Sequence, residues 1–214
     1  MSGLVLSLFP GIGLLDRAFE EAGFCVVRGP DVLWGGDVRT FTPPAGRFDG
    51  IIGGPPCQRF STLSALVRHN GLEQAENLIP EFERCIDAAA VSWFLMENVR
   101  QAPLPAVNGY TVQSELIRDH WCGGETMRLR RFSLGLAHSQ PFGRFHVETL
   151  ALHRTDPECA ALASKQGLPA DFLEDSPFTV EGKVKMIGNG VPLPMGRAVA
   201  RAVKAALEQR SAAA

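Results

Sequence analysis

The sequence lacks several features that define large classes of protein. It has no Cys-x-x-Cys pair, and its five cysteines, an odd number, lie 28 to 37 positions apart. This pattern argues against a zinc ribbon or a disulfide framework, so we expect no metal site and a reducing, cytoplasmic compartment. No apolar run approaches the roughly 18 residues of a membrane helix, and Leu4–Phe9 is too short for a signal-peptide core. We therefore expect no membrane segment.

An excess of charge of one sign is also missing. The 21 Lys and Arg against 23 Asp and Glu leave a net charge of −2, which argues against a protein that coats nucleic acid. A hydrophobic fraction of 45% in 214 residues is typical of one globular domain. Cations still gather locally, because residues 50–72, 126–147 and 182–207 contain Arg or Lys and no acid. These segments could therefore still form a local basic face for nucleic acid.

The sequence does contain short apolar runs that alternate with helical patterns. The expected strands are 4–9, 24–27, 48–52 and 93–96. The expected helices are 14–22, 81–91 with Pro80 in its first turn, and 198–214. Strands alternating with helices predict an α/β fold with a doubly wound, mostly parallel sheet.

The first strand ends in a glycine-rich turn, Phe9-Pro10-Gly11-Ile12-Gly13. Glycines let the backbone approach a ligand closely, and free N–H groups at the start of a helix suit a carboxylate. A dinucleotide-binding fingerprint needs another glycine where Asp16 stands, which disfavours NAD. Asp31 follows the second strand, where an acid can accept hydrogen bonds from ribose hydroxyls. Taken alone, the pattern is also that of an ordinary tight turn.

Two further loops contain reactive side chains. Cys57 follows Gly53-Gly54-Pro55-Pro56, and the two prolines stiffen the entry to it. A buried structural cysteine is the alternative, but a cysteine in a Gly/Pro turn before Gln58 and Arg59 favours an exposed nucleophile. Glu97 directly follows an apolar strand, a place typical of a helix cap or of a site acid.

Together these loops resemble the DNA (cytosine-5) methyltransferase family. Five blocks occur in the family's order: FxGxG at Phe9–Gly13, PPCQxFS at Pro55–Ser61, ENV at Glu97–Val99, RxR at 128–130 and GNxVP at Gly188–Pro192. The resemblance implies a Rossmann-like, class I fold that uses S-adenosylmethionine. It also implies DNA as the partner, double-stranded with one flipped cytosine.

The resemblance implies a role for each matching residue. Cys57 would add to C6 of the cytosine, and Glu97 would hold the exocyclic amine and protonate N3. The paired arginines Arg128 and Arg130 would bind O2 of the flipped nucleotide and a nearby phosphate. The remaining substrate contacts are expected from Gln58, Arg59, Ser61 and Arg144.

The cofactor residues are implied in the same way. Phe9, Gly11 and Gly13 match the turn that binds the methionine part. Asp31 matches the ribose acid, and Asp37 the acid near the adenine amine. The rest of the expected set is Pro55, Asn189 and Val191. Trp34 has two interpretations, a stack on adenine or, as the more common case, a buried core residue.

The sequence departs from the family at three places. Thr126 stands where the family has Gln, two residues before Arg128, so we expect altered loop geometry there. Asp37 follows Asp31 by six positions, too few for the helix that the family places between these strands. The separate recognition domain is nearly absent, because a block within 153–172 resembles the family's penultimate one and leaves only a short insert. A compact chain of this kind is typical of phages and mobile elements.

We thus expect a catalytic and cofactor-binding core in 1–135, a residual target-recognition loop in 136–152, and a return to the core in 153–214. Gln140, Phe142, Arg144 and His146 of the loop are expected to touch DNA. A few such groups can read only a very short motif. Two alternatives stay open: a methyltransferase whose protein partner reads the target, and a catalytically silent regulator that binds S-adenosylmethionine or DNA. RNA is a further possible substrate.

Overall fold

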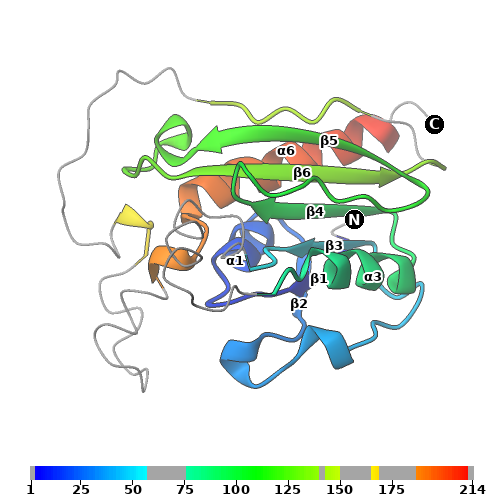
Figure 1. The fold of residues 1–214 in the computed structure, drawn as a ribbon. Helices are drawn as coiled ribbons and strands as arrows, with labels where there is room; N and C mark the ends of the chain where they lie inside the picture. Colours follow the sequence, from blue (N-terminus) through cyan, green and yellow to red (C-terminus); the bar gives the residue numbers. More distant parts are fainter. Residues whose placement is uncertain (1–2, 57–75, 140–142, 150–164, 169–186, 212–214) are drawn as a thin grey trace.

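The computed structural model describes residues 3–56, 76–139, 143–149, 165–168 and 187–211. Within these ranges, six strands form one sheet in the order β2-β1-β3-β4-β6-β5 (Figure 1). The strands are β1 (Leu4–Leu8), β2 (Cys25–Arg28), β3 (Gly50–Gly53), β4 (Trp93–Asn98), β5 (Tyr110–Arg118) and β6 (Leu129–Ala137). The four expected strands are therefore confirmed to within two residues at each end.

The sheet has a parallel part and an antiparallel part. β1 pairs in parallel with β2 and β3, and β3 pairs in parallel with β4. β6 then runs antiparallel to both β4 and β5. β5 is not among the strands expected from the sequence. It is an edge strand and only its Ile117 is fully buried, so it lacks the apolar run that marked the other strands.

Both faces of the sheet are covered, which confirms the doubly wound architecture. α1 (Leu14–Glu21) and α6 (Leu193–Ser211) pack on one face, and α3 (Ile79–Ala89) packs on the other. Successive side chains of a strand alternate between these layers. In β4, for example, Leu95 joins the first core and Phe94 the second. Figure 1 shows α6 lying along β5 and β6.

The C-terminal helix begins earlier than expected, at Leu193 instead of 198. Pro194 is accommodated because proline fits the first turn of a helix. Gly196 then allows α6 to approach α1 closely, since a Cβ there would lie 2.9 Å from the Cβ of Ala18. No helix in the described part of the chain is long and apolar enough to span a membrane.

The connection between β2 and β3 contains two short 3-10 turns and no α-helix. They are η1 (Val32–Trp34) and η2 (Val38–Thr40). Asp31 and Asp37 cap them by accepting hydrogen bonds from the backbone N–H groups of Leu33 and Arg39. The expected absence of a helix in this connection is confirmed, and the capping hydrogen bonds fix the positions of Asp31 and Asp37.

Residues 143–149 lie in extended form beside the edge strand β5. The side chain of Gln113 accepts from the N–H of Phe145 at 2.8 Å, and that of Glu115 accepts from the N–H of Val147 at 2.9 Å. Phe145 and Val147 are buried in the core shared with α6. This part of the expected recognition loop therefore packs beside the edge strand β5 and contributes side chains to the core.

Candidate active site

A cavity of about 410 Å³ lies at the carboxyl ends of the parallel strands. Its walls come from the turns after β1, β2 and β3, from Glu97 near the end of β4, from Arg128 and Arg130 at the start of β6 and from residues 189–191. Ligands of open α/β sheets bind at this edge, and the volume is within the usual range for small-molecule sites. Seven of the eight expected cofactor residues line this cavity, and so do the expected catalytic residues Glu97, Arg128 and Arg130; the seven are Phe9, Gly11, Asp31, Asp37, Pro55, Asn189 and Val191.

The turn after β1 depends on its two glycines for different reasons. Gly11 has a φ of 56°, and a Cβ there would meet nothing within 4 Å. Gly13 has a φ of 78°, and a Cβ there would lie 2.4 Å from a guanidinium nitrogen of Arg28. The absence of a side chain at Gly11 thus leaves the space beside the turn free. The absence of one at Gly13 leaves room for the side chain of Arg28.

A polar cluster that sequence analysis did not assign lies against this turn. Asp16 is completely buried, and its two carboxylate oxygens accept from Ser7 Oγ at 2.5 Å and from Arg28 Nε at 3.0 Å. Burial raises the pKa of Asp16, although the bonds from Ser7 and Arg28 act in the opposite direction. The signal in the sequence was an acid on the apolar face of a helix, between Leu15 and Phe19.

Asp31 connects the second strand to the glycine turn. Its Oδ2 accepts from the N–H of Gly11, and its Oδ1 accepts from the N–H of Leu33, both at 2.8 Å. A carboxylate has about four acceptor positions, so Asp31 can still accept from hydroxyls in the cavity. Trp34 donates to the carbonyl of Gly11 at 2.7 Å and is 61% exposed. The interpretation of Trp34 as a core residue is wrong.

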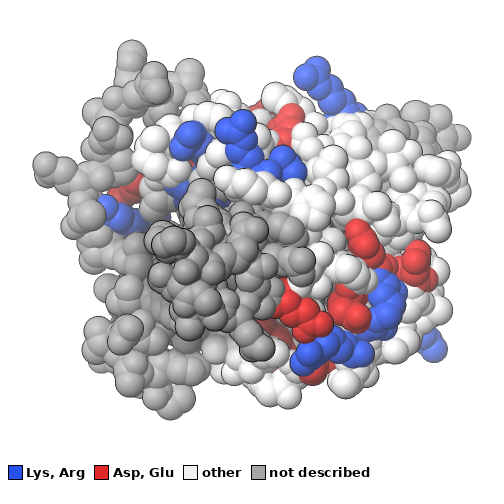
Figure 2. All heavy atoms as spheres, in the orientation of Figure 1, with Lys and Arg blue, Asp and Glu red and all other residues white. Residues whose placement is uncertain are grey.

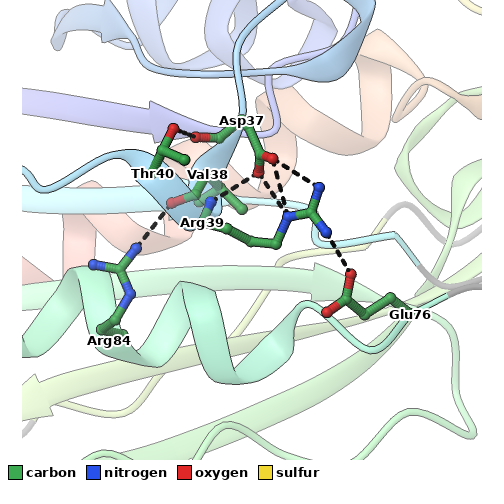
Figure 3. Close-up of polar contacts among 6 residues, drawn as sticks. All are labelled: Asp37, Val38, Arg39, Thr40, Glu76 and Arg84. Carbon is green, nitrogen blue, oxygen red and sulfur yellow. Dashed lines mark hydrogen bonds and ion pairs between the residues drawn. The ribbon is translucent and has the colours of Figure 1, made fainter.

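Asp37 is held by a neighbouring cation (Figure 3). Arg39 contacts both carboxylate oxygens of Asp37 at 2.7 to 3.0 Å and reaches Glu76 at 3.0 Å through another nitrogen. These hydrogen bonds lower the pKa of Asp37. Arg84 of α3 donates to the carbonyls of Val38 and Phe41, so the helix anchors the same turn. Arg39 and Glu76 line the cavity, although no motif in the sequence points to either.

Glu97 stands at the opposite end of the cavity, near the end of β4. Its side chain is 12% exposed, and Oε1 lies 2.8 Å from Nε of Arg130. A Cβ at Gly54 would lie 3.1 Å from Oε2, so the loop after β3 passes directly beside the acid. Asn98 donates from Nδ2 to the carbonyl of Pro55 at 3.2 Å, which ties the two loops together.

The predicted nucleophile directly follows Pro56 in the sequence. Cys57, Gln58, Arg59 and Ser61 lie outside the described residues, as do Gln140 and Phe142 of the predicted recognition loop. Pro55 and Pro56, which precede Cys57, line the cavity together with Glu97. Arg144 is exposed and does not line the cavity. His146 contacts Glu115 at 2.9 Å on the edge strand.

The two arginines of the RxR block have different partners. Arg130 contacts Glu97, whereas Arg128 donates to the carbonyls of Gly188 at 2.6 Å and Asn189 at 2.9 Å. Thr126, which replaces the family's Gln, donates through its N–H and hydroxyl to the buried carboxylate of Asp119. Thr126 therefore has its hydrogen-bond partner within the tip of the β5–β6 hairpin, which contains η4 (Asp119–Cys122).

Charged side chains are distributed unevenly over the face shown in Figure 2. Acidic and basic groups alternate at its lower edge, over the β2–β3 connection and α3, whereas basic groups predominate above the end of the β5–β6 hairpin. In the described ranges, no group of three or more His, Cys, Asp or Glu residues is placed to bind a metal ion. The site thus offers carboxylates, guanidinium groups and backbone donors.

Comparison with known proteins identifies methyltransferases as relatives of this chain. The chain is 32% identical over 164 residues to the type II methyltransferase M.HgiDI of Herpetosiphon aurantiacus, covering 62% of this chain and 52% of the relative. It is 30% identical over 158 residues to M.NgoPII of Neisseria gonorrhoeae, covering 65% and 43%. The chain therefore spans about half the length of these curated relatives.

Solved structures share the fold along almost the whole chain. A prophage-encoded protein of E. coli, assigned as a DNA modification methyltransferase, superposes with a TM-score of 0.70 at 16% identity over 97% of this chain and 100% of that one. The methyltransferase EhMeth of Entamoeba histolytica gives 0.69 at 11% identity over 97% and 99%. A family model described as C-5 cytosine-specific DNA methylase matches residues 35–156, more than half of the chain. The chain belongs to the C-5 cytosine-specific DNA methylase family.

Proposed function

We propose that this chain transfers a methyl group from S-adenosylmethionine to C5 of cytosine in duplex DNA, through a covalent adduct with Cys57. The observation that carries the proposal is that one cavity joins the glycine turn and Asp31 at one end to Glu97 and Arg130 at the other. A methyl transfer requires both substrates to meet in such a continuous space. Enzymes of this family in general depend on S-adenosylmethionine.

The residues at the first end fit this cofactor. Gly11 leaves open space above the turn, and the start of α1 suits the carboxylate of the methionine part. Asp31 would accept from ribose hydroxyls, and Asp37 would accept from the adenine amine. When bound, S-adenosylmethionine supplies a methyl group activated on a positively charged sulfur.

The second end fits the chemistry of cytosine. The thiolate of Cys57 forms a bond to C6, while Glu97 delivers a proton to N3 and accepts from the exocyclic amine. The electron pair of the C5–C6 double bond would then form the bond from C5 to the methyl group, whose bond to the sulfonium sulfur breaks. Loss of the C5 proton to a base, expulsion of the thiolate and return of the N3 proton to Glu97 would restore the neutral aromatic ring. Arg130 orients the carboxyl group of Glu97 through their contact at 2.8 Å.

The target must leave the DNA stack to reach this cavity. Arg59 and Arg144 would supply phosphate contacts, which makes affinity depend strongly on salt. Because the segment between β6 and residue 153 is short, we expect a very short or relaxed target motif.

A trapping experiment tests the proposal. The purified chain is incubated with S-adenosylmethionine and duplex DNA that contains 5-fluorocytosine, and a covalent complex is expected on a denaturing gel. Cys57→Ala should abolish this complex and leave cofactor binding intact, because the sulfur forms the bond. Trapping by Cys57→Ala would contradict the assigned nucleophile.

The same assay separates the alternatives. Methyl transfer only after a second protein is added would favour a partner that reads the target. Cofactor binding without trapping under any condition would favour a silent regulator. Competition between duplex DNA and tRNA would show which nucleic acid is the substrate.

A further inference from the structure

Arg128 connects two segments that are distant in the sequence. It directly precedes β6, and its Nη1 and Nη2 donate to the carbonyls of Gly188 at 2.6 Å and Asn189 at 2.9 Å. These carbonyls lie 60 and 61 positions away along the chain. A planar guanidinium fork suits two adjacent acceptors, and hydrogen bonds from a charged donor are among the stronger ones.

The segment that Arg128 contacts forms part of the cavity wall. Asn189, Gly190 and Val191 line the cavity, as Arg128 does. Gly190 is in close contact with α1, because a Cβ there would lie 2.6 Å from a methyl carbon of Leu14. The wall segment is therefore held between Leu14, which packs against it, and Arg128, which binds its carbonyl groups.

The neighbouring Arg130 shows a different orientation. Its Nε contacts the carboxylate of Glu97, and its Nη1 donates to the carbonyl of Leu129. Glu97 is the acid at the cytosine end of the cavity, so Arg130 is directed toward the target base. Arg128 is directed toward the family's last block, Gly188–Pro192, and the two arginines act on different ends of the cavity.

We infer that Arg128 is a positioning residue for the cofactor: it fixes the wall formed by residues 188–191, in contrast to the nucleotide contact implied by the family resemblance. This inference rests on the proposed function. Without Arg128, the carbonyl groups of Gly188 and Asn189 lose their charge-assisted donors, and the wall becomes less well fixed. The cofactor should then bind more weakly even when no DNA is present.

Isothermal titration with S-adenosylhomocysteine, without DNA, tests the inference. Arg128→Ala should weaken binding by about tenfold, the effect of losing roughly 1.4 kcal/mol. Arg128→Lys should give a smaller loss, because it keeps the charge but not the fork. Arg118→Ala is the matched control, since Arg118 also donates to a backbone carbonyl near the start of β6, that of Met127, and no change is expected.

Kinetics distinguish positioning from general damage. Arg128→Lys should raise KM for S-adenosylmethionine, while kcat at saturating cofactor and the salt dependence of DNA binding stay near wild type. Unchanged affinity of both Arg128 variants for S-adenosylhomocysteine would overturn the inference, as would a lower salt slope of DNA binding with normal cofactor affinity. If Arg128→Ala does not fold, the result for Arg128→Lys decides. Failure of the wild-type chain to bind S-adenosylhomocysteine would instead overturn the proposed function.

Discussion

The two ends of the cavity are built in different ways. At the cofactor end, Gly11, Asp31 and Asp37 lie in the turns that follow β1 and β2, and Asp31 joins the two turns by accepting from the N–H of Gly11. At the target end, Glu97 near the end of β4 contacts Arg130 of the antiparallel strand β6. One end is thus assembled mainly from backbone turns and the other from side chains of two paired strands, so changes at the two ends should separate cofactor binding from chemistry.

The largest effect is expected at the target end. Glu97→Gln keeps the size of the side chain but cannot deliver a proton to N3, so the rate of methyl transfer should fall by about 100-fold or more. Affinity for S-adenosylhomocysteine should stay within about twofold, because the glycine turn and Asp31 are untouched. Single-turnover transfer of labelled methyl groups measures the rate. A normal rate in Glu97→Gln would remove the distinction between the two ends.

A smaller effect is expected at the cofactor end. Asp31→Asn replaces a charged acceptor by a neutral one, so affinity for S-adenosylhomocysteine should fall by about tenfold. The transfer rate at saturating cofactor should recover, because Glu97 and Arg130 lie at the other end. Titration and the split between KM and kcat check this. A loss of kcat without a rise in KM for the cofactor would contradict the assignment of Asp31.

The turn after β1 allows a comparison of two glycines. Gly11→Ala should cost about 1–2 kcal/mol of stability, because an L residue is strained at its positive φ. Gly13→Ala has the same strain and also displaces Arg28 from Asp16, so its loss should be larger. Both variants replace glycine by alanine, so urea unfolding of the two measures the difference between their losses in free energy of unfolding. Equal losses would show that the Arg28 contact does not stabilise the turn.

The smallest effect concerns the pH dependence of stability. Burial raises the pKa of Asp16 above its ordinary value of 3.8, so the folded protein holds the proton more tightly than the unfolded chain. The contribution of Asp16 to stability is then full below the unfolded pKa and is lost as pH rises through the folded pKa. Asp16→Asn does not titrate, so its free energy of unfolding should improve relative to wild type as pH rises above about 4. Parallel melts from pH 4 to 8 measure this, and a difference independent of pH would contradict it.

Much of the fold could be predicted because β1, β3 and β4 are buried and apolar, and because the exposed edge strand β2 still contains two adjacent valines. The edge strand β5 could not, since its side chains are mostly half-exposed and residues 143–149 are joined to it through the side chains of Gln113 and Glu115. In the described part of the expected recognition loop, Phe145 and Val147 are buried in the core, whereas Arg144 and His146, which are expected to touch DNA, are exposed.

The sequence by itself determined the order of the strand-end turns, and with it the cofactor end of the cavity, because the carboxyl ends of parallel strands meet at one edge. It also determined the absence of a helix between Asp31 and Asp37, since six positions are too few for one. Only the tertiary structure decided the partners of Arg128 and Arg130. These residues are two positions apart, with the same side-chain chemistry, and their partners at 188–189 and 97 are brought to them by the folding of the whole chain.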